Sequence, residues 1–152
     1  MGAIQPTHHD AELILKLYDL RREPVMREAR KFIAGFSPKS VDDLLAVANT
    51  PGTQNAYLRQ VYGYWEMAAA FVVHGALNPV LAFDTLQEMY FAYGKIQPFL
   101  EEFRQKQGAP DFLMNLQKVV EGSAQGRERL ARVQKRQAEM ARRQAGAAKQ
   151  GA

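Results

Sequence analysis

Apolar side chains recur three and four residues apart along most of the chain, which is the spacing of an amphipathic α-helix. Together with capping residues, glycines and prolines, this pattern predicts helices over residues 8–22, 24–35, 38–48, 54–74, 79–93, 96–107 and 110–121. The strict alternation typical of half-buried strands is scarce. We therefore predict an all-α fold, an irregular bundle of six or seven helices, the number depending on whether the sixth segment continues the fifth.

Local signals predict where these helices begin and end. Thr7 and Asp10 resemble a capping box at the start of the first helix. Ser37 is a suitable N-cap for the third helix. Gly94 and Pro98 indicate a break or a kink in the helical region that contains them.

The segment 54–74 is the longest and most apolar of the predicted helices. Apolar residues cover well over half of its circumference, as expected for a helix that packs on several sides. Trp65 lies near its middle, and Gly75 stands where a left-handed residue would end it. We expect this segment to be the central helix of the bundle.

The composition changes abruptly beyond residue 121. Residues 122–152 carry eight Lys or Arg and two acids, whereas residues 1–121 carry twelve bases and fourteen acids. We therefore divide the chain into a helical domain over residues 1–121 and a basic Ala/Gln/Arg-rich tail, helical or disordered, over residues 122–152. The tail cations of interest are Arg127, Arg129, Arg132, Lys135, Arg136, Arg142 and Arg143.

The tail admits three interpretations. Its sizeable apolar residues, Leu130, Val133 and Met140, follow a sparse heptad and are too few to bury a stable face by themselves. A solvated, helix-prone extension is the simplest interpretation, and docking on a protein partner or a second subunit is the next. Sequence-independent attraction to nucleic acid is the third, because cations that neutralise phosphates release counterions, although no aromatic residues are interleaved for base stacking. An anionic membrane fits less well, because the tail lacks large apolar residues to enter the lipid boundary.

Composition also excludes several classes of chemistry. The chain has no Cys, so it has no disulfides and no thiolate metal site or nucleophile. Phosphate-binding, dinucleotide-binding and hydrolase motifs are absent, and we predict no catalytic residues, no cofactor and no metal. The longest apolar run, residues 67–73, is far shorter than a membrane span, and no secretory signal is recognisable, so we expect a cytoplasmic protein.

Several short motifs of the chain resemble a widespread bacterial family of unknown function. They are the Tyr64-Trp65-Glu66 element, His74-Gly75, the Pro98-Phe99 turn that leads to Arg104, and Asn115-Leu116. Members of that family are small all-helical domains, and many carry a membrane-spanning helix just before the domain, which is missing here. The resemblance implies a fold without implying an activity.

Glu66 stands out because a carboxylate in the middle of the most apolar helix is costly to bury without a partner. The resemblance points to Arg104 as that partner, so that Glu66 and Arg104 would form a buried polar pair. Arg59 or a tyrosine hydroxyl is an alternative. A catalytic role would need a cleft, a shifted pKa and a second reactive group, and nothing near Glu66 in the sequence supplies that group.

Aromatic residues are dense between residues 57 and 103, and most of them should form the core. Those that we consider candidates for a groove or an interface, together with one histidine, are Tyr57, Tyr62, Tyr64, Trp65, His74 and Tyr93. The leading hypothesis is a non-enzymatic protein-interaction or self-association module, with a protein partner or a homo-oligomer. The alternatives are nucleic-acid association through the tail, and a small-ligand binder or cryptic enzyme around Glu66.

Overall fold

The structure, a computed structural model, describes residues 4–151, and its elements are all helical. In chain order they are α1 (His8–Arg22), α2 (Pro24–Gly35), α3 (Val41–Asn49), α4 (Thr53–Val73), α5 (Pro79–Thr85), α6 (Glu88–Ile96), the 3-10 turn η1 (Gln97–Phe99), α7 (Leu100–Gln107), α8 (Met114–Glu121) and α9 (Ala124–Gln150). The predicted all-α class is confirmed over this range.

The predicted number of helices was too small. The single helix expected over residues 79–93 is two helices, because Leu86 leaves the helical region with φ −99° and ψ 51° while its side chain is fully buried. The tail also forms a helix of its own, α9, so that residues 4–151 contain nine α-helices. Two further boundaries differ: Ser40 rather than Ser37 caps α3, and α8 begins at Met114 rather than near residue 110.

The capping box predicted at the start of α1 is confirmed. The Thr7 backbone N–H donates to the Asp10 carboxylate over 2.6 Å, and the Asp10 N–H donates back to the Thr7 hydroxyl. The same carboxylate accepts the backbone N–H of Asn78 over 2.7 Å, and the Asn78 side chain caps α5. The beginnings of α1 and α5 are therefore held together by one buried acid.

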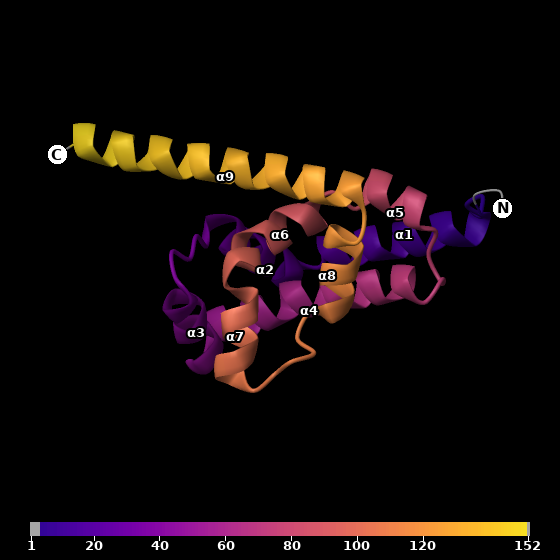
Figure 1. The fold of residues 1–152 in the computed structure, drawn as a ribbon, viewed down its shortest axis with the longest axis horizontal. Coiled ribbons are helices and arrows are strands. Elements are labelled where there is room, and N and C mark those ends of the chain that lie inside the picture. The colour runs from indigo at the N-terminus through magenta and orange to yellow at the C-terminus, as the bar shows by residue number, and fades with distance from the viewer. Residues whose placement is uncertain (1–3, 152) are drawn as a thin grey trace.

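Helix α4 is the centre of the fold, as the sequence predicted. It packs against α2, α3, α6 and α8, and in Figure 1 it runs through the middle of the molecule with α8 crossing in front of it. Trp65 is completely buried near its midpoint, among the core residues of the bundle. Because α4 is covered on several sides, its few polar side chains have to find partners within the protein.

Helix α9 lies along the top of the molecule in Figure 1 and extends past it towards the C-terminus. Its inner half, residues 124–137, packs on α6 and α8, with Leu130 only 5% exposed. Every residue of its outer half, residues 138–150, is exposed. The basic segment is thus a single helix of which one half is docked and the other half is not.

Glutamine side chains and a glycine make the docking of the inner half possible. The Gln134 amide donates to the Gly94 carbonyl over 3.2 Å, and the Gln137 amide donates to the Phe91 carbonyl over 2.8 Å. A Cβ atom at Gly94 would lie 3.1 Å from the Gln137 side-chain oxygen and 3.3 Å from the Gln134 side chain. Gly94 therefore does not end α6, which continues to Ile96, but allows α9 to approach its backbone closely. The predicted break is found at η1, which contains Pro98.

Replacing Leu130 by alanine should lower the free energy of unfolding by about 2 to 4 kcal/mol, because it removes the main apolar contact of the inner half and leaves a cavity. Met140→Ala is the matched control, since Met140 lies on the outer half and is 54% exposed, and it should change stability by less than about 0.5 kcal/mol. Urea unfolding followed by circular dichroism measures both. Equal effects of the two substitutions would contradict the docking of the inner half.

Candidate functional site

Glu66 caps the beginning of α8 from the neighbouring helix α4. Its carboxylate accepts the backbone N–H of Asn115 over 3.0 Å, the Asn115 side-chain amide over 2.8 Å and the backbone N–H of Leu116 over 2.9 Å. The residue at the N-cap position of α8, Leu113, is left-handed with φ 57° and offers no side-chain hydrogen bond. The first N–H groups of α8 therefore depend on Glu66, which also places a negative charge at the positive end of the helix dipole.

The predicted pair between Glu66 and Arg104 is not formed. Arg104 is buried, and its Nε donates to the Phe112 carbonyl over 2.8 Å while Nη1 donates to the Gln117 side chain over 2.9 Å. Glu66 and Arg104 thus both hold α8 and the loop before it. Each forms hydrogen bonds with groups of that segment, and the two do not pair with each other. The reason is physical: the free N–H groups of a helix start suit a carboxylate, and a free loop carbonyl suits a guanidinium.

Beside Glu66 lies a groove of about 580 Å³, which we call the Gly63 groove. It is framed by α3, α4, α7 and the loop 108–113, and its wall contains the aromatic rings of Tyr62, Phe103 and Phe112. Gly63 is exposed in the groove, and a Cβ atom built on it would meet nothing within 4 Å. The groove is an apolar channel along the exposed side of α4 with charged residues at its edge.

The structure places most of the aromatic candidates in the core rather than at a surface. Tyr62, Tyr64, Trp65 and Tyr93 are buried, and the three tyrosine hydroxyls donate to the Ala92 carbonyl, the Leu17 carbonyl and the Glu121 carboxylate. Burial raises the pKa of all three tyrosines. Tyr64 and Tyr93 therefore do not rim a groove, contrary to expectation.

The two remaining candidates are more accessible. Tyr57 is half-buried against the ring of Phe32, and His74 is exposed at the C-cap of α4. Neither lies in the lining of the Gly63 groove. The aromatic candidates consequently do not assemble into one site.

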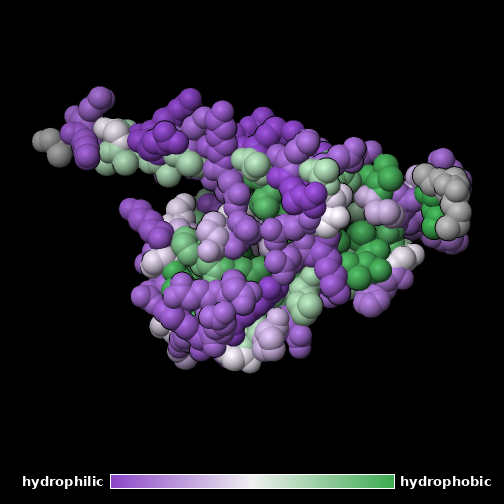
Figure 2. Space-filling view, viewed as in Figure 1, coloured by the Kyte–Doolittle hydropathy of each residue, from purple (hydrophilic) through white to green (hydrophobic). Residues whose placement is uncertain are grey.

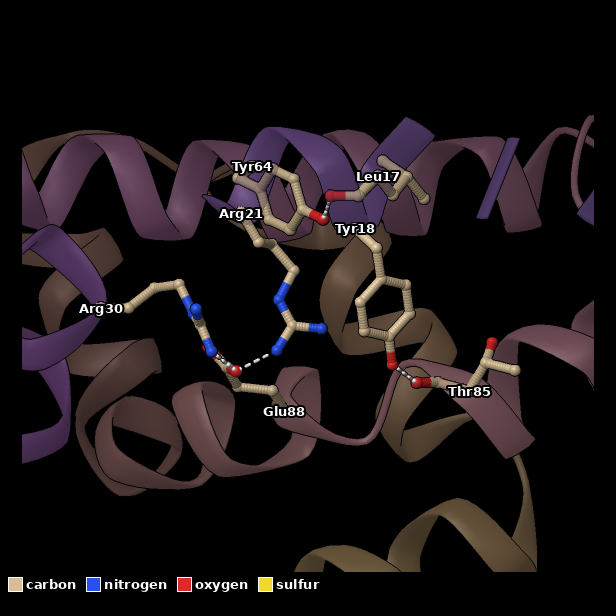
Figure 3. Close-up of polar contacts among 7 residues, drawn as sticks. All are labelled: Leu17, Tyr18, Arg21, Arg30, Tyr64, Thr85 and Glu88. Carbon is tan, nitrogen blue, oxygen red and sulfur yellow. Dashed lines mark hydrogen bonds and ion pairs between the residues drawn. The ribbon is translucent and has the colours of Figure 1, made fainter. Parts of the chain in front are cut away.

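A charged cluster that sequence reasoning missed connects α1, α2 and α6. Figure 3 shows Arg21 and Arg30 converging on the carboxylate of Glu88, with Arg30 Nε donating to it over 2.7 Å. Burial alone would raise the pKa of Glu88, but the hydrogen bonds and charges of Arg30 and Arg21 together hold it below its ordinary value. In the sequence Glu88 is one acid in the first turn of a helix, and nothing there indicates two arginine partners.

The contacts of this cluster hold helices together. A hollow of about 400 Å³ lies beside it, lined by Arg27, Arg30 and Lys31 over an apolar floor. Glu88 is the acid in its lining, and that carboxylate already accepts from two guanidinium groups. The arrangement binds three helices together and presents no nucleophile with an adjacent base.

Two of the seven predicted tail cations are attached to the body. Arg127 donates to the Glu121 carbonyl over 2.7 Å, and Arg129 donates to the Phe83 carbonyl with its guanidinium 3.5 Å from the centre of the Phe83 ring. The others have no hydrogen bond or ion pair within residues 4–151. We call these five, with Lys149, the unpaired cations: Arg132, Lys135, Arg136, Arg142, Arg143 and Lys149.

No group of three or more His, Asp or Glu residues in the described part of the chain is placed to hold a metal ion. Over the same residues, no helix is both long enough and apolar enough to span a membrane. The features of this region are thus the Gly63 groove beside Glu66 and a basic helix of which one half is docked.

Comparison with known proteins gives the family of this all-helical domain. The family model described as "Domain of unknown function (DUF4760)" matches residues 6–123, and the chain belongs to this family. The match ends one residue before α9 begins. No curated protein and no solved structure shows a significant similarity to the chain.

Replacing Glu66 by alanine should lower the free energy of unfolding by about 1 to 3 kcal/mol, because three N–H groups lose their acceptor. Glu66→Gln should cost less, since one carbonyl oxygen is retained. Glu101→Ala, at an exposed glutamate of α7, is the control and should change stability by less than about 0.5 kcal/mol. An alanine at position 66 with no greater effect than this control would show that α8 does not need the carboxylate.

Glu88 should make the stability of the protein sensitive to acid. Because the pKa of Glu88 is lowered in the folded state, its contribution is complete above the ordinary value of 4.5 and is lost as the pH falls through the folded pKa. Thermal unfolding measured between about pH 5 and pH 3 should therefore decline more steeply for the wild type than for Glu88→Gln. Identical slopes would mean that the folded pKa of Glu88 is not lowered.

Proposed function

We propose that the chain is a non-enzymatic self-association module and that the outer half of α9 is its binding element. The observation that carries this proposal is the continuity of one helix face. Leu130, Gln134 and Gln137 dock the inner half on α6, and the same face continues at Ala141 and Ala148 with nothing covering it.

The two faces of the outer half differ in character. In Figure 2 the side that faces the body is pale green, and the opposite side is purple. Helical spacing places Ala141, Ala145 and Ala148 on one side of the outer half, with Arg142 at the border of that side and Arg143 opposite it. Such a helix offers a smooth, weakly apolar contact face with cations at its borders, which suits pairing with another protein surface.

Energetics favour a partner for this segment. Helices shorter than about 12 to 15 residues are marginal in water unless tertiary packing supports them. The outer half continues the docked half and so needs no nucleation of its own, but no tertiary packing supports it. A surface that covers its alanine face would supply the missing support.

A catalytic role receives less support. Glu66, the residue around which we considered an enzyme, uses its carboxylate to cap α8, and His74 lies exposed at the C-cap of α4, about two helical turns away. We therefore propose a binding function rather than an enzymatic one. A cytoplasmic location remains a prediction.

Nucleic-acid association is the second candidate, and the observation in its favour is the set of unpaired cations of α9. They project from one long helix and are not paired within the described residues. Glu128 and Glu139 interrupt this face, and Arg127 and Arg129 are engaged elsewhere, which weakens the charge available to phosphates. Self-association is the proposal that the uncovered alanine face favours.

Removing residues 138–152 should convert an assembled protein into a monomer, because the binding element is lost while the inner half stays docked. Light scattering after size-exclusion chromatography, over a range of concentrations, measures the mass of both proteins. Unfolding by heat provides the control, since the shortened chain should retain the folded body. A full-length protein that stays monomeric at every concentration would overturn the proposal.

A further inference from the structure

The Gly63 groove is an uncovered position where a second helix can approach α4 closely. A glycine inside a helix is less stable than alanine by about 0.5 to 1 kcal/mol. Packing within the chain does not require glycine at position 63, because an added Cβ atom would meet nothing. At Gly94, by contrast, the added atom would press on α9. Gly94 and Gly63 are thus both glycines inside a helix, but only Gly94 is covered by another helix.

The groove around Gly63 is suited to an apolar contact. Leu58, Tyr62 and Phe103 form its nearly buried apolar floor, and the half-buried Phe112 adds a more accessible ring. Its polar groups are largely committed to the fold, since Glu66 caps α8 and the Asn55 amide donates to the Ala48 carbonyl over 2.6 Å. Few unsatisfied polar atoms therefore remain to oppose burial of this surface.

The charge around the groove is negative. The elements that frame it carry five exposed acids, Asp42, Asp43, Glu101, Glu102 and Asp111. Lys106 is the exposed base of α7 and already bridges Asp42 and Glu102, at 3.3 and 3.1 Å. Arg59 is the base on the exposed face of α4 that lines the groove. The surroundings of the groove are thus acidic, whereas the outer half of α9 carries three bases and one acid.

We propose that the Gly63 groove receives the outer half of α9 from a second copy of this chain. The inference rests on the proposed self-association and adds the surface that receives the helix. The alanine face, with Ala141, Ala145 and Ala148, would lie over Gly63, because small side chains on both helices allow their backbones to approach closely. Arg142, at the border of this face, would face Asp111 and the acids of α7, whereas Arg143 lies on the opposite side of the helix.

The helix must come from another molecule. In Figure 1, α9 runs along the top of the molecule, whereas α7 and the loop 108–113 lie at the bottom. The inner half of α9 is fixed on α6 by Leu130 and two glutamines, so the same chain cannot bring its outer half around to the groove. Reciprocal exchange between two copies would form a closed dimer in which each groove is filled once.

The absence of cysteine allows a direct test on the full-length chain. A tagged Ala145→Cys protein is mixed with an untagged Asp111→Cys protein under mild oxidation. A mixed disulfide dimer between them is expected within the assembly. Replacing the second protein by Glu28→Cys, at an exposed position of α2 outside the groove, is the control and should give little mixed dimer. Equal yields from both mixtures would overturn the assignment of the groove.

Filling the groove provides the second test. Gly63→Leu should weaken self-association by at least about tenfold without loss of thermal stability, because the added side chain projects into the groove. Gly35→Leu is the matched control, since its added Cβ atom also meets nothing and it lies outside the groove, and it should leave association unchanged.

The outcomes separate this inference from the proposed function. If removal of residues 138–152 abolishes assembly but Gly63→Leu leaves it intact, α9 is a binding element and the Gly63 groove is not its receptor. If the full-length protein is monomeric throughout, both ideas fail. A tenfold weakening by Gly63→Leu together with a specific cross-link from residue 145 to residue 111 supports both.

Discussion

The carboxylate of Glu66 is the interaction on which the C-terminal part of the fold depends. Helix α8 follows a left-handed Leu113 that offers no side-chain cap, and the N–H groups of its second and third residues are bound by a side chain of α4. Helix α8 packs on α4 and also supports α9. The acid in the middle of the central helix therefore links that helix to the last two helices of the fold.

Some helix starts predicted from sequence were accurate because a strong local signal determines them, whereas α3 was assigned the cap Ser37 in place of Ser40. The starts of α1 and α2 follow from the Thr7 capping box and Pro24, both of which act within one turn of the chain. The break at Leu86 was missed because Leu86 is apolar, completely buried and fits the helical period of its neighbours. What ends α5 there is packing against the rest of the core, which no local pattern records.

The candidate site was predictable only in part, for a related reason. A carboxylate on an apolar helix needs a hydrogen-bonding partner where it is removed from water, so the importance of Glu66, which is half-buried, could be predicted from its position. Its partner could not be predicted, because backbone N–H groups have no signature in the sequence. A charged residue such as Arg104 is the more obvious candidate. Glu88 was missed for the opposite reason: its arginines lie far away in sequence and its own surroundings look ordinary.

The observed contact at Gly94 shows what the proposed contact at Gly63 would be like. The sequence indicated Gly94 as a break, yet it is the position where α9 meets α6 through two glutamine amides and little apolar surface. A contact of the same kind at Gly63 would also bury little apolar area, since alanine contributes few atoms. Its strength would come from close packing of backbones and from cations facing acids at the rim. Because exposed ion pairs are screened by salt, association through this groove should be reversible, concentration-dependent and weaker as ionic strength rises.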